Sequence, residues 1–108
     1  MTYKTEFPDF PDADVPPVFL AAPWRDQSWH NDACPSFARS LGDGKEVHVY
    51  VDYVDESARD ICGEGRFCVS LTDDDGSYPA DEERWFFVSD SLAAVIDQVG
   101  FLCGEVSR

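Results

Sequence analysis

The stretch EVHVYVDYVD, residues 46–55, constrains the fold more than any other part of the sequence. Val47, Val49, Val51 and Tyr53 occupy alternate positions in it. A period of two is typical of a β-strand that has one buried face. We therefore expect a strand over 46–55 whose valine-rich face packs against the core. The opposite face of the sheet is expected to carry the following residues: His48, Tyr50, Asp52, Arg66, Ser70 and Thr72.

Three further segments have the character of strands. Residues 35–41, PSFARSL, precede GDGK at 42–45, which supplies the glycine and aspartate of a hairpin turn. Residues 66–72, RFCVSLT, alternate again, and residues 84–89, RWFFVS, are aromatic and β-prone. Short connections between such segments favour antiparallel pairing. The sequence therefore predicts a sheet of about four mostly antiparallel strands.

The C-terminal segment predicts a helix. Its apolar residues recur at steps of three and four, which places them on one stripe: Leu92, Val95, Ile96, Val99, Leu102 and Cys103. Ser89, Asp90 or Ser91 can cap the first turn, and Gly104 can end the helix. We expect this amphipathic helix to pack on the valine-rich face, which gives an α+β fold.

The N-terminal segment differs in composition. Five prolines fall within residues 1–23, and proline removes backbone donors and fixes φ. We expect residues 1–23 to run extended over a single α+β domain formed by residues 24–108. The opposite face of the sheet is then either partly open or covered by this segment. Its anchors would be the apolar residues Phe7, Phe10, Val18, Phe19 and Leu20.

Net charge limits the class of partner. Twenty-two acidic residues oppose eight basic ones, which gives −14, and the isoelectric point is near 4.1. Such a surface repels nucleic acid and anionic lipid, and attracts a basic protein. The charge exceeds the magnitude of about 2 to 8 that keeps a small domain in solution. A basic partner is therefore favoured, although a purely solubilising surface is the simpler alternative.

The carboxylates are concentrated in four groups, around residues 9–14, 52–64, 73–75 and 81–83. The last three groups fall on or beside connections of the predicted sheet, so we expect several to cluster at one edge. Alternate side chains on a strand lie about 6.6 Å apart, and DNA carries about one charge per 3.4 Å of each strand. Carboxylates on a rigid scaffold can thus approximate a row of phosphates.

A chain of this kind is expected to block a basic, nucleic-acid-binding site on a larger protein and to perform no catalysis. Anti-CRISPR or anti-restriction proteins and immunity proteins of nuclease toxins act in this manner. Aromatic side chains would anchor the contact and carboxylates would steer it, so affinity should fall with salt and reversal of Asp73–Asp75 should slow association. The predicted partner-binding residues are Trp24, Trp29, Asp52, Asp55, Glu56, Asp60, Asp73, Asp74, Asp75, Tyr78, Asp81, Glu82 and Glu83.

The stretch SWHNDACPSF, residues 28–37, supports the alternative of a small enzyme or ligand-binding domain. Trp29, His30, Asp32 and Cys34 would form the site, and a nucleophilic pair of His30 and Cys34 would need the thiol and imidazole to meet. However, asparagine and aspartate form turns, and Pro35 restricts Cys34 to an extended conformation. We therefore interpret this stretch as a structured corner and predict no catalytic residues.

No metal or other cofactor is expected. The four cysteines form no C-x-x-C pair, which argues against structural zinc, and only two histidines are present. Residues 71–82 fit a calcium loop poorly, because Leu71 takes the first ligand position. No apolar run is long enough for a membrane span, and no secretion signal is evident. The cytoplasm, with reduced cysteines, is thus the expected compartment, and the oligomeric state is left undecided.

Overall fold

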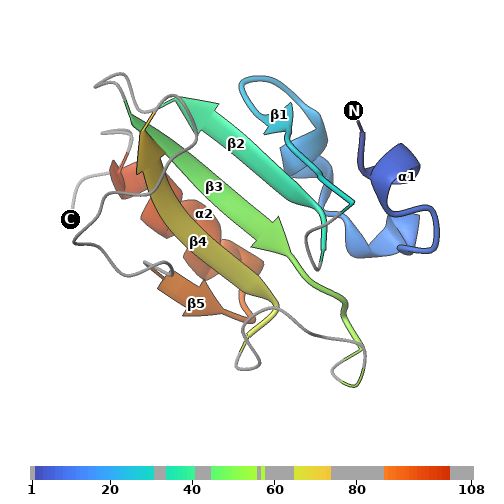
Figure 1. Ribbon diagram of the computed structural model, residues 1–108. Helices are drawn as coiled ribbons and strands as arrows, with labels where there is room; N and C mark the ends of the chain where they lie inside the picture. Colours follow the sequence, from blue (N-terminus) through green and yellow to red (C-terminus); the bar gives the residue numbers. More distant parts are fainter. Residues whose placement is uncertain are drawn as a thin grey trace.

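The computed structural model describes residues 2–30, 34–40, 45–55, 57, 65–73 and 87–102, and of residues 45, 72, 73, 101 and 102 only the backbone. These residues form a five-stranded antiparallel sheet with a C-terminal helix, so the α+β prediction is confirmed (Figure 1). The elements in chain order are α1 (Tyr3–Glu6), the 3-10 helices η1 (Asp12–Asp14) and η2 (Pro17–Leu20), β1 (Arg25–Asp26), β2 (Ser36–Ser40), β3 (Lys45–Val51), β4 (Phe67–Asp73), β5 (Phe87–Ser89) and α2 (Leu92–Leu102).

The strands lie side by side in chain order, β1-β2-β3-β4-β5. The four predicted strands all exist, but β3 ends at Val51 rather than at residue 55. The fifth strand, β1, pairs Arg25 with Ala38 of β2. It has only two residues, so no alternation of apolar and polar residues marks it in the sequence.

The alternation in β3 sorts its side chains as predicted. Val47, Val49 and Val51 are all fully buried. Their partners in β4 extend the same apolar face, since Val49 lies opposite Val69 and Val51 lies opposite Phe67. This face is one wall of the main core.

The helix α2 covers only part of that wall. Val95 and Val99 are buried in the core, and α2 contacts β4 and β5. Ser91 accepts a hydrogen bond from the Ala94 N–H at 3.1 Å, which confirms a cap among residues 89–91. The predicted terminator, Gly104, lies outside the described residues.

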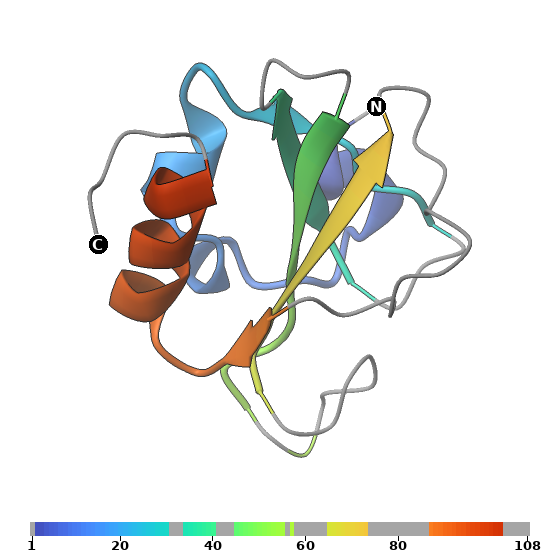
Figure 2. The same cartoon turned by 90° about the vertical axis from the view of Figure 1, so that its left-hand side faces the viewer.

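The N-terminal segment covers the other part of the same wall. Tyr3, Phe10, Val15, Phe19 and Trp24 belong to the same core cluster as the valines of β3. In Figure 2, η2 and α2 lie on one side of the sheet. The sequence offered two alternatives for the opposite face: partly open, or covered by the N-terminal segment. The second alternative is wrong. An 11-residue helix cannot span five strands, so the aromatic residues of the segment complete the layer.

The segment is also less extended than predicted, because α1, η1 and η2 lie within it. Its prolines start turns instead of preventing them. Pro11 and Pro16 are the N-caps of η1 and η2, and Pro17 is the first residue of η2. A missing N–H costs nothing there. Of the predicted anchors, Phe10 and Phe19 are buried, whereas Val18 and Leu20 are 40% and 54% exposed.

The opposite face of the sheet is more buried than an open polar face would be. Cys34, Tyr50 and Cys68 form a second cluster there, with Val88 beside them. Ser70 is fully buried as well. Cys68 is in a disulfide bond, whereas Cys34 is a buried residue outside any disulfide. The prediction of reduced cysteines is therefore wrong for Cys68.

No helix in the described part of the chain is both long enough and apolar enough to cross a membrane.

Candidate functional site: carboxylates at one end of the sheet

Described carboxylates from two of the four acidic groups meet where β3 ends, β4 begins and β5 ends. The N-terminal segment reaches this place because Asp14 Oδ2 accepts the Val54 N–H at 3.1 Å. Phe10 adds a ring contact with Tyr53, at 4.6 Å between centroids. We call this region the acidic end; it consists of Asp9, Asp14, Asp52, Asp55 and Asp90.

The carboxylates of the acidic end affect the pKa of Tyr53. Its pKa is raised above the ordinary value, first by burial of the phenol and then by the charges of Asp52 and Asp9. Asp14 contributes to the same shift. The bond of Asp14 to the Val54 N–H and the ring contact of Phe10 with Tyr53 place the carboxylates of the two segments near this hydroxyl, and the direction of the pKa shift agrees with that geometry.

Arg66 forms hydrogen bonds with three residues of the acidic end. Its guanidinium donates to the main-chain carbonyls of Asp14 and Asp52, the second at 3.3 Å. The Arg66 N–H donates to Asp90 Oδ1 at 3.0 Å, and the guanidinium lies 4.7 Å from the Phe67 ring centre. One side chain thus ties the ends of η1 and β3 to the start of β4.

The members of the acidic end differ in exposure. Asp9, Asp55 and Asp90 are exposed, and Asp14 is half-buried. Asp52 is fully buried and accepts the Tyr53 N–H at 2.9 Å. We therefore remove Asp52 from the predicted contact residues and keep it as a structural group beside them. Asp9, Asp14 and Asp90 are not in the predicted set, although Asp9 and Asp14 belong to one acidic group in the sequence.

Asp73 and Asp52, two of the predicted contact residues, lie at opposite ends of the sheet. Asp73 lies opposite Lys45, at the start of β3, whereas Asp52 follows the end of that strand. A rise of about 3.3 Å per residue separates the two ends of β3 by roughly 20 Å. The remaining predicted contact residues lie outside the described part: Glu56, Asp60, Asp74, Asp75, Tyr78, Asp81, Glu82 and Glu83.

The two predicted tryptophan anchors have different surroundings. Trp24 is 9% exposed and packs edge-on against Phe19, with centroids 4.8 Å apart. The Arg39 guanidinium lies 5.8 Å from its ring centre. Trp29 is 42% exposed and its ring lies 4.4 Å from that of His30. Trp29 can therefore contact a partner, while Trp24 is chiefly a core residue.

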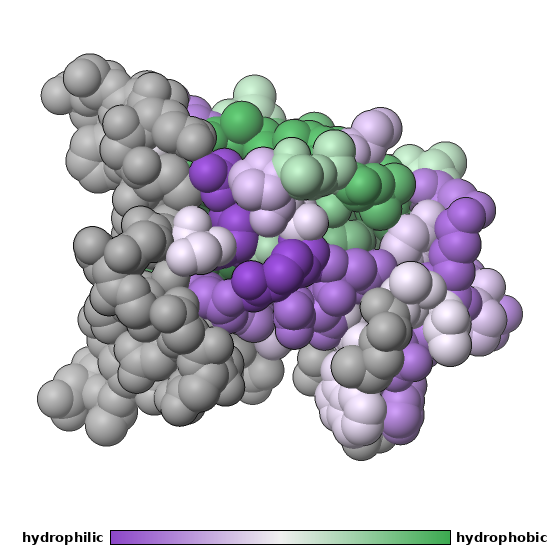
Figure 3. All heavy atoms as spheres, turned by 90° about the horizontal axis from the view of Figure 1, so that it is seen from above, coloured by the Kyte–Doolittle hydropathy of each residue, from purple (hydrophilic) through white to green (hydrophobic). Residues whose placement is uncertain are grey.

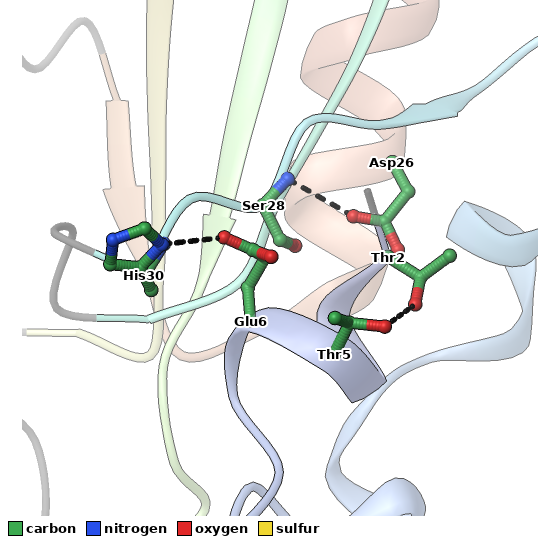
Figure 4. Close-up of polar contacts among 6 residues, drawn as sticks. All are labelled: Thr2, Thr5, Glu6, Asp26, Ser28 and His30. Carbon is green, nitrogen blue, oxygen red and sulfur yellow. Dashed lines mark hydrogen bonds and ion pairs between the residues drawn. The ribbon is translucent and has the colours of Figure 1, made fainter.

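The stretch from Ser28 forms a structured corner as far as it is described (Figure 4). His30 Nδ1 lies 2.9 Å from Glu6 Oε1, and the His30 N–H donates to the same oxygen at 3.1 Å. The side-chain bond to His30 is the main reason why the pKa of Glu6 is lowered. Asp26 Oδ1 accepts the Ser28 N–H at 3.0 Å. The two bonds of Glu6 join α1 to the corner.

The described residues of this corner do not assemble a nucleophile. The His30 imidazole pairs with Glu6, and Cys34 is buried in the second cluster with Tyr50 and Cys68. His48 Nε2 lies 3.5 Å from Glu46 Oε1 on β3, away from the corner. Asp32 lies outside the described residues, so the enzyme alternative stays a prediction. Within the described ranges, no group of three histidine, cysteine or acidic residues could hold a metal ion.

The exposed surface combines charge with apolar areas. Val18, Leu20, Trp29 and Val54 are the large exposed apolar side chains of the described chain. On the face seen from above, hydrophobic and hydrophilic residues occupy adjoining areas (Figure 3). A partner on this face can therefore meet hydrophilic and apolar groups together.

Comparison with protein-family models, with curated proteins and with solved structures gives no match for this chain.

Proposed function

We propose that this chain is a small acidic binding protein that occupies a cationic, nucleic-acid-binding surface of a larger protein. The observation that carries the proposal is the acidic end. There Asp9, Asp55 and Asp90 are exposed, and they come from three separate segments of the chain. A net charge of −14 surrounds this array with a negative field. Such a field attracts basic partners and repels nucleic acid itself.

The rigidity of the acidic end supports the same function. Side chains held on a fixed backbone lose less entropy on binding than side chains on a free loop. The bonds of Arg66 to Asp14, Asp52 and Asp90 supply that fixed backbone. Carboxylates would steer the encounter and set the register, while Trp29 would supply desolvated contact area. Anti-CRISPR, anti-restriction and immunity proteins are the classes that such a molecule would join.

The first experiment identifies the target. The tagged protein is used to capture partners from a host lysate at low salt, and the column is then washed with duplex DNA or with RNA. We expect a basic nucleic-acid-binding protein that the nucleic acid displaces. Capture of a partner that stays bound in high salt and in the presence of excess nucleic acid would contradict the proposal, because binding would not depend on charge.

The second experiment locates the contact. Asp9→Lys and Asp97→Lys change the charge equally at two exposed positions, one at the acidic end and one on α2. We expect Asp9→Lys to slow association with the captured target about threefold and Asp97→Lys to leave it nearly unchanged. Reversal of Asp73, Asp74 and Asp75 to lysine tests the other end of the sheet. If neither Asp9→Lys nor the triple reversal slows association, the acidic surface is not the contact.

The compartment of action is part of the proposal. The sequence predicts the cytoplasm, where nucleic-acid-handling targets are found, but disulfides persist mainly in oxidising compartments. Thiol labelling of protein taken directly from cells, followed by mass spectrometry of the Cys68 peptide, distinguishes the cytoplasm from an oxidising compartment. A labelled, reduced Cys68 would support action in the cytoplasm and would show that the disulfide of the structure does not form in the cell. An unlabelled Cys68 would place the protein, and its target, outside the reducing cytoplasm.

A further inference from the structure

A cavity of about 340 Å³ opens where α1, η2 and β1 meet. Phe19 of η2 and Trp24 form an aromatic wall, in edge-on contact with 4.8 Å between their ring centroids. Phe19 also stacks on Phe37 at 5.6 Å, so the core holds this wall in place. Leu20, which is 54% exposed, continues the apolar lining to the surface. The volume is at the lower end of the range of about 300–1,000 Å³ for ligand sites.

Asp26 of β1 is a fixed polar group in the lining. Its Oδ2 accepts the Tyr3 N–H at 2.7 Å, and its Oδ1 accepts the Ser28 N–H at 3.0 Å. The second of these bonds is drawn in Figure 4. Each oxygen of an ionised carboxylate can accept one more hydrogen bond. The half-buried Asp26 is therefore a preorganised acceptor for a donor that enters beside the aromatic wall.

The charges that line the cavity balance each other. The described lining residues include one ammonium group, on Lys4, and one carboxylate, on Asp26. Just outside the lining, Asp12 Oδ2 lies 4.0 Å from Lys4 Nζ. The Arg39 guanidinium lies 5.8 Å from the Trp24 ring centre, so these two neighbours add one further charge of each sign. An uncharged occupant suits the cavity, because it meets the apolar wall without taking an ionised group out of water.

We propose that this cavity receives a tryptophan side chain of a protein partner. The indole ring packs on Phe19 and Leu20, and its N–H donates to Asp26. An indole N–H only donates and an ionised carboxylate only accepts, so the two groups match. Phenylalanine lacks this donor, and arginine brings a charge that the lining does not require. Tryptophan is also among the residues that contribute most to binding at protein interfaces.

A side chain of a partner is favoured over a free small molecule, because Leu20 is an exposed part of the lining. A partner chain that covers Leu20 buries apolar surface in addition to that of the indole, which strengthens binding. The inference goes beyond the proposed function, since it needs a protein partner but uses neither the acidic end nor the charge of that partner.

Uncharged, blocked pentapeptides test the proposal, each with one test residue between two pairs of glycines. The test residue is tryptophan, phenylalanine, or 1-methyltryptophan, which lacks the N–H. NMR titration of the isotope-labelled protein gives the affinities, and the Tyr3 and Ser28 amide signals report on Asp26, which accepts both N–H groups. The tryptophan peptide should shift both signals and bind about fivefold more tightly than the other two, which cannot donate to the carboxylate.

A variant at the surface of the cavity gives a second readout. Leu20→Gln should weaken binding of the tryptophan peptide about threefold, because apolar contact with the indole is lost. Val18→Gln is the matched control and should leave the affinity unchanged. Val18 is an exposed apolar residue of the same 3-10 helix that does not line the cavity.

Equal affinity for the tryptophan and 1-methyltryptophan peptides would overturn the proposal, as would Tyr3 and Ser28 signals that do not move with millimolar tryptophan peptide. Tighter binding of an arginine peptide at physiological salt would also overturn it, because the cavity would then select a charge. None of these results affects the acidic end. The proposed function fails separately, if the charge reversals leave association with the captured target unchanged.

Discussion

The guanidinium of Arg66 donates a hydrogen bond to the backbone carbonyl of Asp14, which joins the start of β4 to the N-terminal segment across 52 residues of sequence. The same side chain donates to the carbonyl of Asp52. The N-terminal segment is therefore part of the domain and not an appendage. The carboxylates of the acidic end depend on this connection for their positions.

Arg66→Ala should lower the free energy of unfolding by about 1.5–3 kcal/mol, because main-chain carbonyls lose a charged donor. Urea denaturation measures the change, and hydrogen exchange should show faster exchange of the Val54 N–H, which is bonded to Asp14. Lys4→Ala is the control, since Lys4 is exposed and 4.0 Å from Asp12. Equal stability of the two variants would contradict the role assigned to Arg66.

The bond between His30 and Glu6 should be visible in the titration of Glu6. The pKa of Glu6 lies below its ordinary value of 4.5, chiefly because of that bond. A depressed pKa stabilises the fold above the ordinary pKa, and this contribution declines as pH falls through the folded pKa. His30→Ala should raise the Glu6 pKa toward 4.5. Carboxyl carbon NMR measures it, and an unchanged value would show that the pair does not form in solution.

Tyr53 should ionise above its ordinary pKa of 10.0. Burial is the largest cause, so Asp9→Asn should reduce the shift only in part, while Asp97→Asn should not change it. Because the folded pKa is raised, the stabilisation is present below pH 10.0 and is lost as pH rises through the folded pKa. NMR titration of the Tyr53 ring tests this. A pKa that does not respond to Asp9→Asn would place Asp9 away from Tyr53.

Gly65→Ala should destabilise the junction of β4 and β5. A Cβ at Gly65 would lie 2.8 Å from Val88 Cγ1 and 3.1 Å from the backbone of Ser89, so neighbouring atoms must move. We expect a loss of about 1–3 kcal/mol in unfolding free energy. The double variant with Val88→Ala should recover part of the loss, because only the backbone contact remains. A Gly65→Ala protein as stable as the original would show that the approach of the two strands is looser.

Alternation and helical periodicity were sufficient to predict most of the sheet and α2. The period of apolar residues identifies the buried face of a strand or helix. The valines of β3 are buried as their spacing indicates, and so are Val95 and Val99 of α2. β1 was not predictable, since two residues carry no period and its pairing with β2 is a tertiary contact. The turns at Pro11 and Pro16 were missed because proline excludes helix interiors but not helix starts.

The sequence by itself determined the class of fold, the faces of the strands and the strongly negative charge, since these follow from local pattern and composition. Only the tertiary structure decided where the charges meet. It brought Asp9 and Asp14 to the end of β3, sent Asp73 to the other end and buried Asp52. The path of the N-terminal segment and the register of the strands set the positions of these carboxylates. Neither can be read from the spacing of acidic residues along the chain.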